Sequence, residues 1–434
     1  CPDFHEIMAE FRHFPYNSKS KAMKRSVTSL LLLACFLMAS ACSQSPQRLL
    51  DAANRYHDKK KYPEASILYR KAIAKDKTFA EAYYREGLNL LDQNNPVEAS
   101  KFLRRAVDLN PNNADAEIKL AEIYLTAYAL DPQKFKNLLP EIKDLTGKIL
   151  KRDPHDFHGI RLQAFIYLAD KNMPKAIETF QVANQLRPHS RELVGWLAQT
   201  LVADQQFGEA EKLMRDMIAH DKTWGPAYDF LFVQYSKQNK TPEAEQILKD
   251  RITNDPQNSL SYINYSNFLL AHQRYPEAEQ TMKKLLDDPK AFPNRHQLLG
   301  DFYARSAEDM RLTEADRGQR RELALAEYRE GAKENPKENL VYQQRIIATL
   351  SRLGTTDPAK QVEAIKLAKQ LSDDNPKDLL SNQIYASLLL DTGLKQDVNK
   401  SLTELKALVK NHNTDPILHL DLARAYFFLN QQDE

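Results

Sequence analysis

The chain has 434 residues, of which 42% are hydrophobic and 28% are charged, so it can form a packed core and is too apolar for a disordered protein. Glycine is scarce, with 11 residues, and neither of the two glycine-rich phosphate-binding motifs occurs. The 61 basic residues are balanced by 59 acidic ones, so the basic excess that is typical of nucleic-acid binding is absent. The composition therefore argues against a glycine-rich nucleotide site and against a nucleic-acid partner.

Residues 23–46 read as a targeting segment. A basic pair at 24–25 is followed by an apolar run at 30–38 and by small residues at 39–41, directly before Cys42. This order resembles the signal peptide of bacterial lipoproteins. The resemblance implies that residues 23–41 are a removed signal peptide, that Cys42 is acylated, and that residues 42–46 tether the chain to a lipid bilayer. An uncleaved signal anchor is the alternative, although its strongly apolar part is shorter than a membrane span requires.

The lipoprotein resemblance also implies a location. Ser43, rather than Asp, follows the acylated cysteine, which in that family indicates the outer membrane. We therefore expect a lipid-anchored protein of the bacterial cell envelope, facing the periplasm. Residues 1–22 precede the natural-looking start at Met23, and we expect them to be a non-native or disordered segment.

From residue 46 onward one 34-residue unit recurs. In most units a small residue on the expected first helix is followed by an alanine on the expected second helix. An Asp-Pro or Asn-Pro pair then ends the unit. The order and the period of these markers resemble the tetratricopeptide repeat (TPR), a helix–turn–helix unit. The alanines recur at intervals of 34 residues within two runs: Ala65 and Ala99, then Ala176, Ala210, Ala244 and Ala278.

The resemblance predicts an all-α fold, a TPR α-solenoid in which about ten repeats form a right-handed superhelix over residues 47–434. The small residues let paired helices cross closely, and the prolines begin or end helices because they lack an N–H and restrict the preceding residue. Phe232 stands where the sixth repeat should carry a small residue. The third and eighth repeats contain extra residues. The last helix, expected at 416–429, has no partner helix, which predicts that the natural chain continues beyond Glu434.

Motifs that carry catalysis or bind metals are missing from the sequence. No H-E-x-x-H, EF-hand loop or G-x-S-x-G is present, and the closely spaced pair His155 and His158 has no third ligand nearby. The sequence therefore predicts that the chain is not an enzyme, holds no metal or other cofactor, and has no small-molecule substrate.

One stripe along the first helices is predicted to line the concave face of the solenoid. It is mostly apolar, with one polar side chain in most repeats, as expected of a groove for an extended peptide or a partner helix. The alternative is that these side chains only widen the core between helices. The predicted groove residues are Tyr84, Leu88, Ile118, Glu122, Arg161, Phe165, Gln199, Val233, Ile263 and Asn267.

Two functions remain open. The first is a membrane-anchored scaffold that binds protein or peptide partners in the cell envelope. Such a scaffold would be similar to the TPR lipoproteins that serve the assembly of pili and of outer-membrane proteins, or exopolysaccharide export and the protein sorting linked to it. The second is the repeat region of a larger enzyme whose catalytic domain lies beyond the C-terminal end of this sequence.

Overall fold

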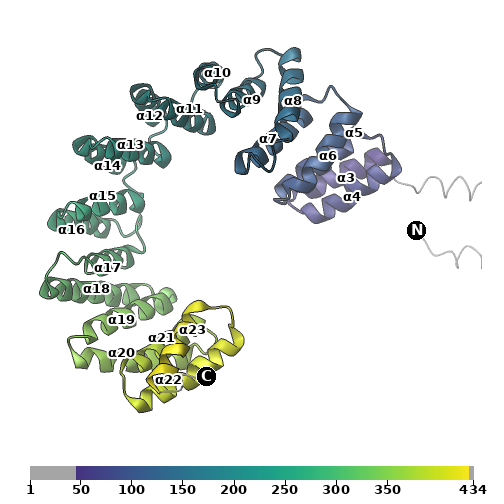
Figure 1. Ribbon diagram of the computed structural model, residues 1–434. Coiled ribbons are helices and arrows are strands. Elements are labelled where there is room, and N and C mark those ends of the chain that lie inside the picture. Colours follow the sequence, from purple (N-terminus) through teal and green to yellow (C-terminus); the bar gives the residue numbers. More distant parts are fainter. Residues whose placement is uncertain (1–44, 430–434) are drawn as a thin grey trace, which may run out of the picture. The chain divides into compact units, whose positions relative to one another are not determined.

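The computed structural model describes residues 45–429, and within that range 21 α-helices follow one another without any β-strand (Figure 1). The all-α prediction is therefore confirmed. The chain divides into two units, residues 1–210 and residues 211–434, each built from consecutive helical hairpins. The predicted signal peptide, Cys42 and the upstream segment lie outside the described residues.

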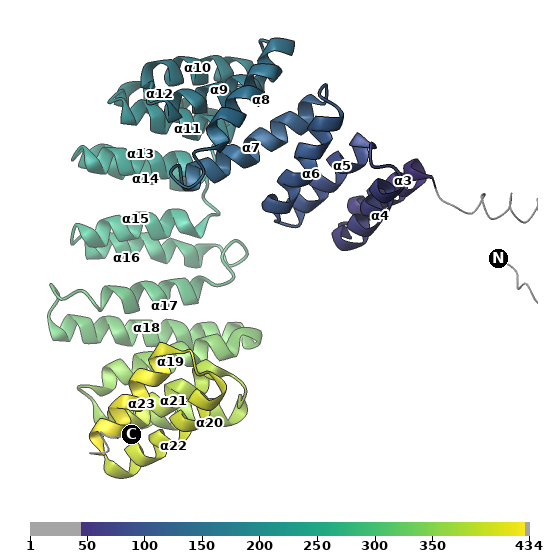
Figure 2. The same ribbon diagram turned by 45° about the vertical axis from the view of Figure 1, so that its right-hand side comes forward.

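In the first unit each helix packs against the next one in the chain (Figure 2). The hairpins pair α3 (Pro46–Asp58) with α4 (Tyr62–Lys75), α5 (Ala80–Asp92) with α6 (Pro96–Leu109), α7 (Ala114–Leu130) with α8 (Leu138–Arg152), and α9 (Phe157–Ala169) with α10 (Met173–Leu186). Helix α11 (Arg191–Ala203) follows, and α12 (Phe207–His220) contains the division between the units.

The second unit continues the same alternation. Its helices are α13 (Gly225–Lys237), α14 (Thr241–Asn254), α15 (Ser259–Ala271), α16 (Tyr275–Lys283), α17 (Arg295–Ser306), α18 (Glu314–Glu334), α19 (Asn339–Gly354), α20 (Pro358–Asp374), α21 (Leu379–Asp391), α22 (Lys395–Asn411) and α23 (Pro416–Phe428). Two short 3₁₀ turns, η2 (Lys284–Asp287) and η3 (Pro336–Glu338), follow α16 and α18.

The helix crossings are as close as the small residues predicted. A Cβ atom placed on Gly87 of α5 would lie 2.7 Å from Cγ of Leu103 on α6, and one on Gly300 would lie 2.5 Å from Cε1 of Tyr328. A larger side chain at either position would force the two helices apart. The alanines on the second helices are fully buried in the same way: Ala65, Ala99, Ala176, Ala210, Ala244 and Ala278.

The turn inside most repeats contains a residue with positive φ, which the sequence did not reveal. Lys171, between α9 and α10, has φ of 57°, and the N–H of Asn172 donates to the carbonyl of Tyr167 over 2.8 Å. This is the Schellman arrangement that closes a helix C-terminus. The same turn recurs at 34-residue spacing within two runs, with Lys60 and Asn94, then Lys171, Gln205, Asn239 and Gln273 at its left-handed position.

We expect Lys171→Gly to stabilise the first unit by about 0.5–1 kcal/mol, because glycine adopts positive φ without the cost of a Cβ atom. Chemical denaturation measures the change. Lys148→Gly in the interior of α8 is the matched control, and it should destabilise by about 1 kcal/mol because helical φ gives glycine no advantage there. Equal losses from both substitutions would contradict this account of the turn.

The extra residues of the third repeat lengthen its first helix. Helix α7 has 17 residues, whereas α5 and α9 have 13 each, and the remaining inserted residues connect α7 to α8. In the eighth repeat the insertion lengthens the hairpin, since α18 extends over 21 residues. The added turn of α7 projects beyond the end of its neighbours and forms one wall of the pocket described next.

Candidate functional site

The predicted groove residues fall into four groups. Glu122, Arg161 and Phe165 line one pocket of the first unit, and Val233 and Asn267 line a pocket of the second unit. Leu88, Gln199 and Ile263 line neither of these pockets, and nothing else in the structure assigns them to a groove.

Two further groove predictions fall in the core. Ile118 is buried among the residues that join α6, α7, α8 and α9, and Tyr84 packs against that cluster. Their positions agree with the alternative interpretation, in which part of the stripe widens the core between helices.

The pocket of the first unit, here called the α7–α9–α11 pocket, has a volume of ≈ 630 Å³, which is in the range of ordinary ligand sites. Three successive first helices form it, and the added turn of α7 supplies part of its wall. It is lined by Glu122, Leu125, Thr126, Tyr128, Ala129, Leu130, Arg161, Phe165, Leu168, Ala169, Glu192 and Trp196.

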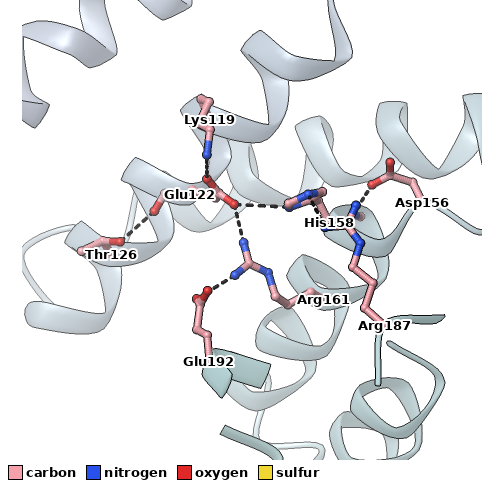
Figure 3. A network of polar contacts seen from close by, with 9 residues as sticks. Lys119, Glu122, Thr126, Asp156, His158, Arg161, Arg187 and Glu192 are labelled. Atoms are coloured by element: carbon pink, nitrogen blue, oxygen red, sulfur yellow. Dashed lines mark hydrogen bonds and ion pairs between the residues drawn. The ribbon is translucent and has the colours of Figure 1, made fainter. Parts of the chain in front are cut away.

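Arg161 holds the polar side of this pocket together (Figure 3). Its side chain is buried, with 7% of the residue exposed, and its guanidinium contacts carboxylates on both neighbouring first helices. Nη1 donates to Oε1 of Glu192 over 2.7 Å, and Nη2 donates to Oε1 of Glu122. Because a buried guanidinium is stable only when it is paired, these contacts fix α7, α9 and α11 relative to one another.

Glu122 is the centre of the network. Lys119 Nζ lies 2.9 Å from its Oε2, and His158 Nδ1 lies 3.5 Å from its Oε1 (Figure 3). Burial alone would raise the pKa of Glu122, but hydrogen bonds from His158 and Lys119 and the nearby cationic charges outweigh it and lower the pKa to about 2. Glu122 is therefore ionised wherever the protein is folded at ordinary pH.

The lowered pKa of Glu122 gives a pH dependence of stability. Because the folded-state value is about 2 and the ordinary value is 4.5, the contribution of Glu122 is complete above 4.5 and is lost as the pH falls toward 2. We expect the difference in unfolding free energy between the wild type and Glu122→Gln to shrink over that interval. Denaturation at a series of pH values measures it, and a constant difference would show that the carboxylate charge is irrelevant.

Aromatic rings form the apolar side of the pocket. Phe165 contacts Trp196 and Phe180 edge to face, with ring centroids 5.2 Å and 5.1 Å apart. Trp196 is 41% exposed and Leu130 at the end of α7 is largely exposed, so both present apolar surface at the mouth. Trp196 thus packs against Phe165 on one side and is exposed on the other. Partly exposed aromatic residues of this kind often contribute most of the binding energy at protein interfaces.

The pocket of the second unit, here called the α13–α14–α15 pocket, has a volume of ≈ 590 Å³. Asp229 lies in its lining, and the Asp229 carboxylate accepts a hydrogen bond from Nη1 of the buried Arg251 over 2.7 Å. Its lining consists of Asp229, Phe232, Val233, Ser236, Asn239, Thr241, Ala244, Leu248, Asn264, Asn267, Phe268, Ala271 and His272.

Several residues of the first pocket were not predicted. Glu192 and Trp196 come from α11, whose stripe was represented only by Gln199, and Tyr128 and Leu130 come from the added turn of α7. His158, interpreted from the sequence as an ordinary surface residue, lies beside Glu122. The extra length of the third repeat was the sequence signal for Tyr128 and Leu130, which lie outside the predicted stripe.

Within residues 45–429, no group of three or more His, Cys, Asp or Glu side chains is placed to hold a metal ion. No helix in that range is both long enough and apolar enough to cross a membrane.

The sequence profile of the tetratricopeptide repeat matches residues 80–113, which are α5 and α6 with their turns. A second profile of the same repeat matches residues 167–229. The chain contains tetratricopeptide repeats. The TPR assignment explains the helical hairpins, their period and the buried alanines at their crossings. Among solved TPR structures, the crystal structure of PilW, a type IV pilus biogenesis factor, is 14% identical and covers 50% of this chain and 96% of its own, with a TM-score of 0.41.

Two similar curated proteins carry enzyme names. Protein O-mannosyl-transferase Tmtc3 of Drosophila melanogaster is 26% identical over 34% of this chain and 15% of its own length. Protein O-mannosyl-transferase TMTC3 of Homo sapiens is 24% identical over 62% of this chain and 28% of its own length. The TPR chain thus spans less than a third of either relative.

These relatives correct the prediction that the chain is not an enzyme. That prediction was wrong because it rested on the absence of catalytic motifs from the repeats, and the proteins that the repeats resemble are named as transferases. Repeats are selected for packing and for partner surfaces, so their motifs say nothing about the chemistry of a protein that contains them.

Proposed function

We propose that the chain is a scaffold that binds protein or peptide partners in its α7–α9–α11 pocket. The observation that carries the proposal is the combination of a rigid polar side, fixed by Arg161, with the half-exposed ring of Trp196. A preorganised pocket loses little conformational entropy on binding, and an exposed aromatic anchor supplies apolar contact area. A short apolar segment of a partner matches this lining in size and chemistry.

Site-specific photo-crosslinking in cells tests the proposal. A benzoylphenylalanine at position 130, on the rim of the pocket, should crosslink a defined partner, and Trp196→Ala should reduce the yield at least several-fold. The matched control is Leu186→Ala on α10, because Leu186 has the same 41% exposure as Trp196 but lies outside the pocket. Equal crosslinking in both variants would contradict the assignment of the pocket.

We also propose that Cys42 is acylated and anchors the scaffold to the outer membrane, with the repeats in the periplasm. The support is the order of the basic pair, the apolar run and the small residues before Cys42. Labelling with an alkyne fatty acid should mark the wild type, and Cys42→Ala should abolish the label and release the protein from the membrane fraction. Cys35→Ala, inside the apolar run, is the control that should leave labelling intact. Incorporation of the fatty-acid label into the Cys42→Ala variant would contradict the proposal.

A second candidate function is participation in protein O-mannosylation, and the similarity to the two transferases favours it. In this proposal the pocket binds the protein that receives mannose. Mass spectrometry of envelope proteins should show fewer mannosylated sites after deletion of the gene, with recovery by the wild type and less recovery by Trp196→Ala. Unchanged mannosylation after deletion would exclude this function.

A further inference from the structure

The crossing of α13 with α14 departs from the packing rule of the repeats around it. Where α3, α5, α7, α9, α11, α15 and α17 carry a glycine, alanine or serine against the second helix, α13 carries Phe232. In α5 the equivalent residue is Gly87, and even a Cβ atom there would meet Leu103 at 2.7 Å. The residue equivalent to Leu103 is Leu248, so a benzyl group at 232 cannot occupy the space that the other crossings leave.

Phe232 instead turns toward the next repeat. Its ring lies edge to face against Phe268 of α15, with centroids 6.1 Å apart and planes at 78°. The side chains of Ala244 and Leu248, which belong to the packed interior, then form part of the lining of the α13–α14–α15 pocket. The pocket therefore lies among α13, α14 and α15, and the rings of Phe232 and Phe268 are part of its lining.

The lining indicates a neutral occupant. Asp229 is neutralised by Arg251, and Nδ1 of His272 is engaged with the carbonyl of Phe268 over 2.8 Å. Among the lining residues, no charge is left unpaired that would offset the desolvation of an ion. The guanidinium of Arg305 lies outside the lining, where its Nη1 donates to Oδ1 of Asn267 over 2.9 Å. The apolar interior is bordered by groups that form hydrogen bonds without carrying charge: Ser236, Asn239, Thr241, Asn264 and Asn267.

We propose that the α13–α14–α15 pocket holds one aromatic side chain of a partner polypeptide, and this rests on the proposed partner-binding function. The ring of the partner contacts Phe232 and Phe268 edge to face or offset, the geometry that aromatic rings prefer. The peptide groups on either side of that ring form hydrogen bonds with the uncharged rim, where Asn264 and Ser236 offer an amide and a hydroxyl. The matching of an uncharged lining to an uncharged side chain sets the specificity.

Binding of small probes to the full chain tests the proposal. The probes are N-acetyl-tryptophanamide, N-acetyl-leucinamide and N-acetyl-glutamate, which are aromatic, aliphatic and anionic in turn, and ligand-observed NMR measures each dissociation constant. We expect the aromatic amide to bind at least tenfold more tightly than the other two. Equal binding of the three probes, or no saturable binding of the aromatic one, would overturn the proposal.

Two variants locate the binding. Val233→Trp should block the mouth and weaken the aromatic probe at least tenfold, because Val233 lines the pocket and is 42% exposed. Leu260→Trp is the matched control on α15, since Leu260 is 55% exposed and lies outside the lining, and it should leave binding unchanged. Equal affinity in the two tryptophan variants would place the probe elsewhere and overturn the proposal.

Phe232→Ala tests the contribution of the ring itself. Alanine removes one of the two rings that the aromatic probe is proposed to contact, so the probe should lose at least tenfold in affinity. Wild-type affinity in this variant would show that the pocket does not depend on Phe232. The two proposals can fail separately. If only the aromatic-binding proposal is wrong, Trp196→Ala still reduces crosslinking. If only the partner-binding function of the α7–α9–α11 pocket is wrong, Trp196→Ala has no effect on crosslinking, but the aromatic probe still binds.

Discussion

Gly87→Leu is expected to destabilise the first unit by about 3 kcal/mol, at the upper end of the overpacking range. The reason is geometric, because a Cβ atom at this position already falls 2.7 Å from the side chain of Leu103 and an isobutyl group has nowhere to go. Denaturant unfolding measures the total, and hydrogen exchange should place the largest loss of protection in α5, α6 and the adjoining helices.

Gly147→Leu is the control for that substitution. Gly147 is also helical, on α8, but a Cβ atom there meets nothing within 4 Å. This variant should be neutral or up to about 1 kcal/mol more stable, because leucine favours the helix more than glycine does. Similar losses in the two variants, or a uniform loss of protection along the chain, would refute the close-crossing explanation.

Arg161→Met is expected to destabilise the first unit by about 2–3 kcal/mol. Removal of one partner from a fully buried ion pair costs about 3–5 kcal/mol, and the smaller value applies here because Glu192 is 63% exposed and regains hydration. Methionine preserves most of the apolar stem, so the loss reports the charged contacts rather than a cavity. Denaturation of the full chain measures the change.

Arg85→Met provides the comparison for Arg161→Met. Arg85 pairs with Glu81 on the same helix over 2.6 Å, and both side chains are largely exposed. Such pairs contribute less than about 1 kcal/mol. If the two arginine variants lost the same stability, the network around Arg161 would be an ordinary surface contact.

The sequence was a sufficient guide to local structure because the features that determine it are local. Ala99 and Pro96 lie on one helix, and Asn110 ends that helix as the Asn-Pro pair predicted. The Schellman turns escaped prediction because none of the six has glycine, the recognisable signal, at the left-handed position, and four of them have lysine or glutamine there.

The pockets were only partly predictable because their residues meet across long stretches of chain. Arg161 is separated by 39 residues from Glu122 and by 31 from Glu192, and no local period specifies such pairs. The predicted groove stripe correctly placed Glu122 and Arg161 on the same surface. It also placed Ile118 on that surface, although Ile118 is buried. Whether a stripe faces a groove or the core depends on how far each helix rotates as repeats stack, which sequence spacing does not fix.

The pairing of Arg161 with two carboxylates has a consequence for how the first unit comes apart. A stack of repeats behaves as a one-dimensional lattice in which each member is coupled to its immediate neighbours. Arg161 strengthens both of these couplings for its own repeat, because one guanidinium on α9 pairs with α7 on one side and with α11 on the other. A boundary between folded and unfolded repeats therefore costs additional free energy when it falls inside residues 114–203, because it breaks one of these ion pairs.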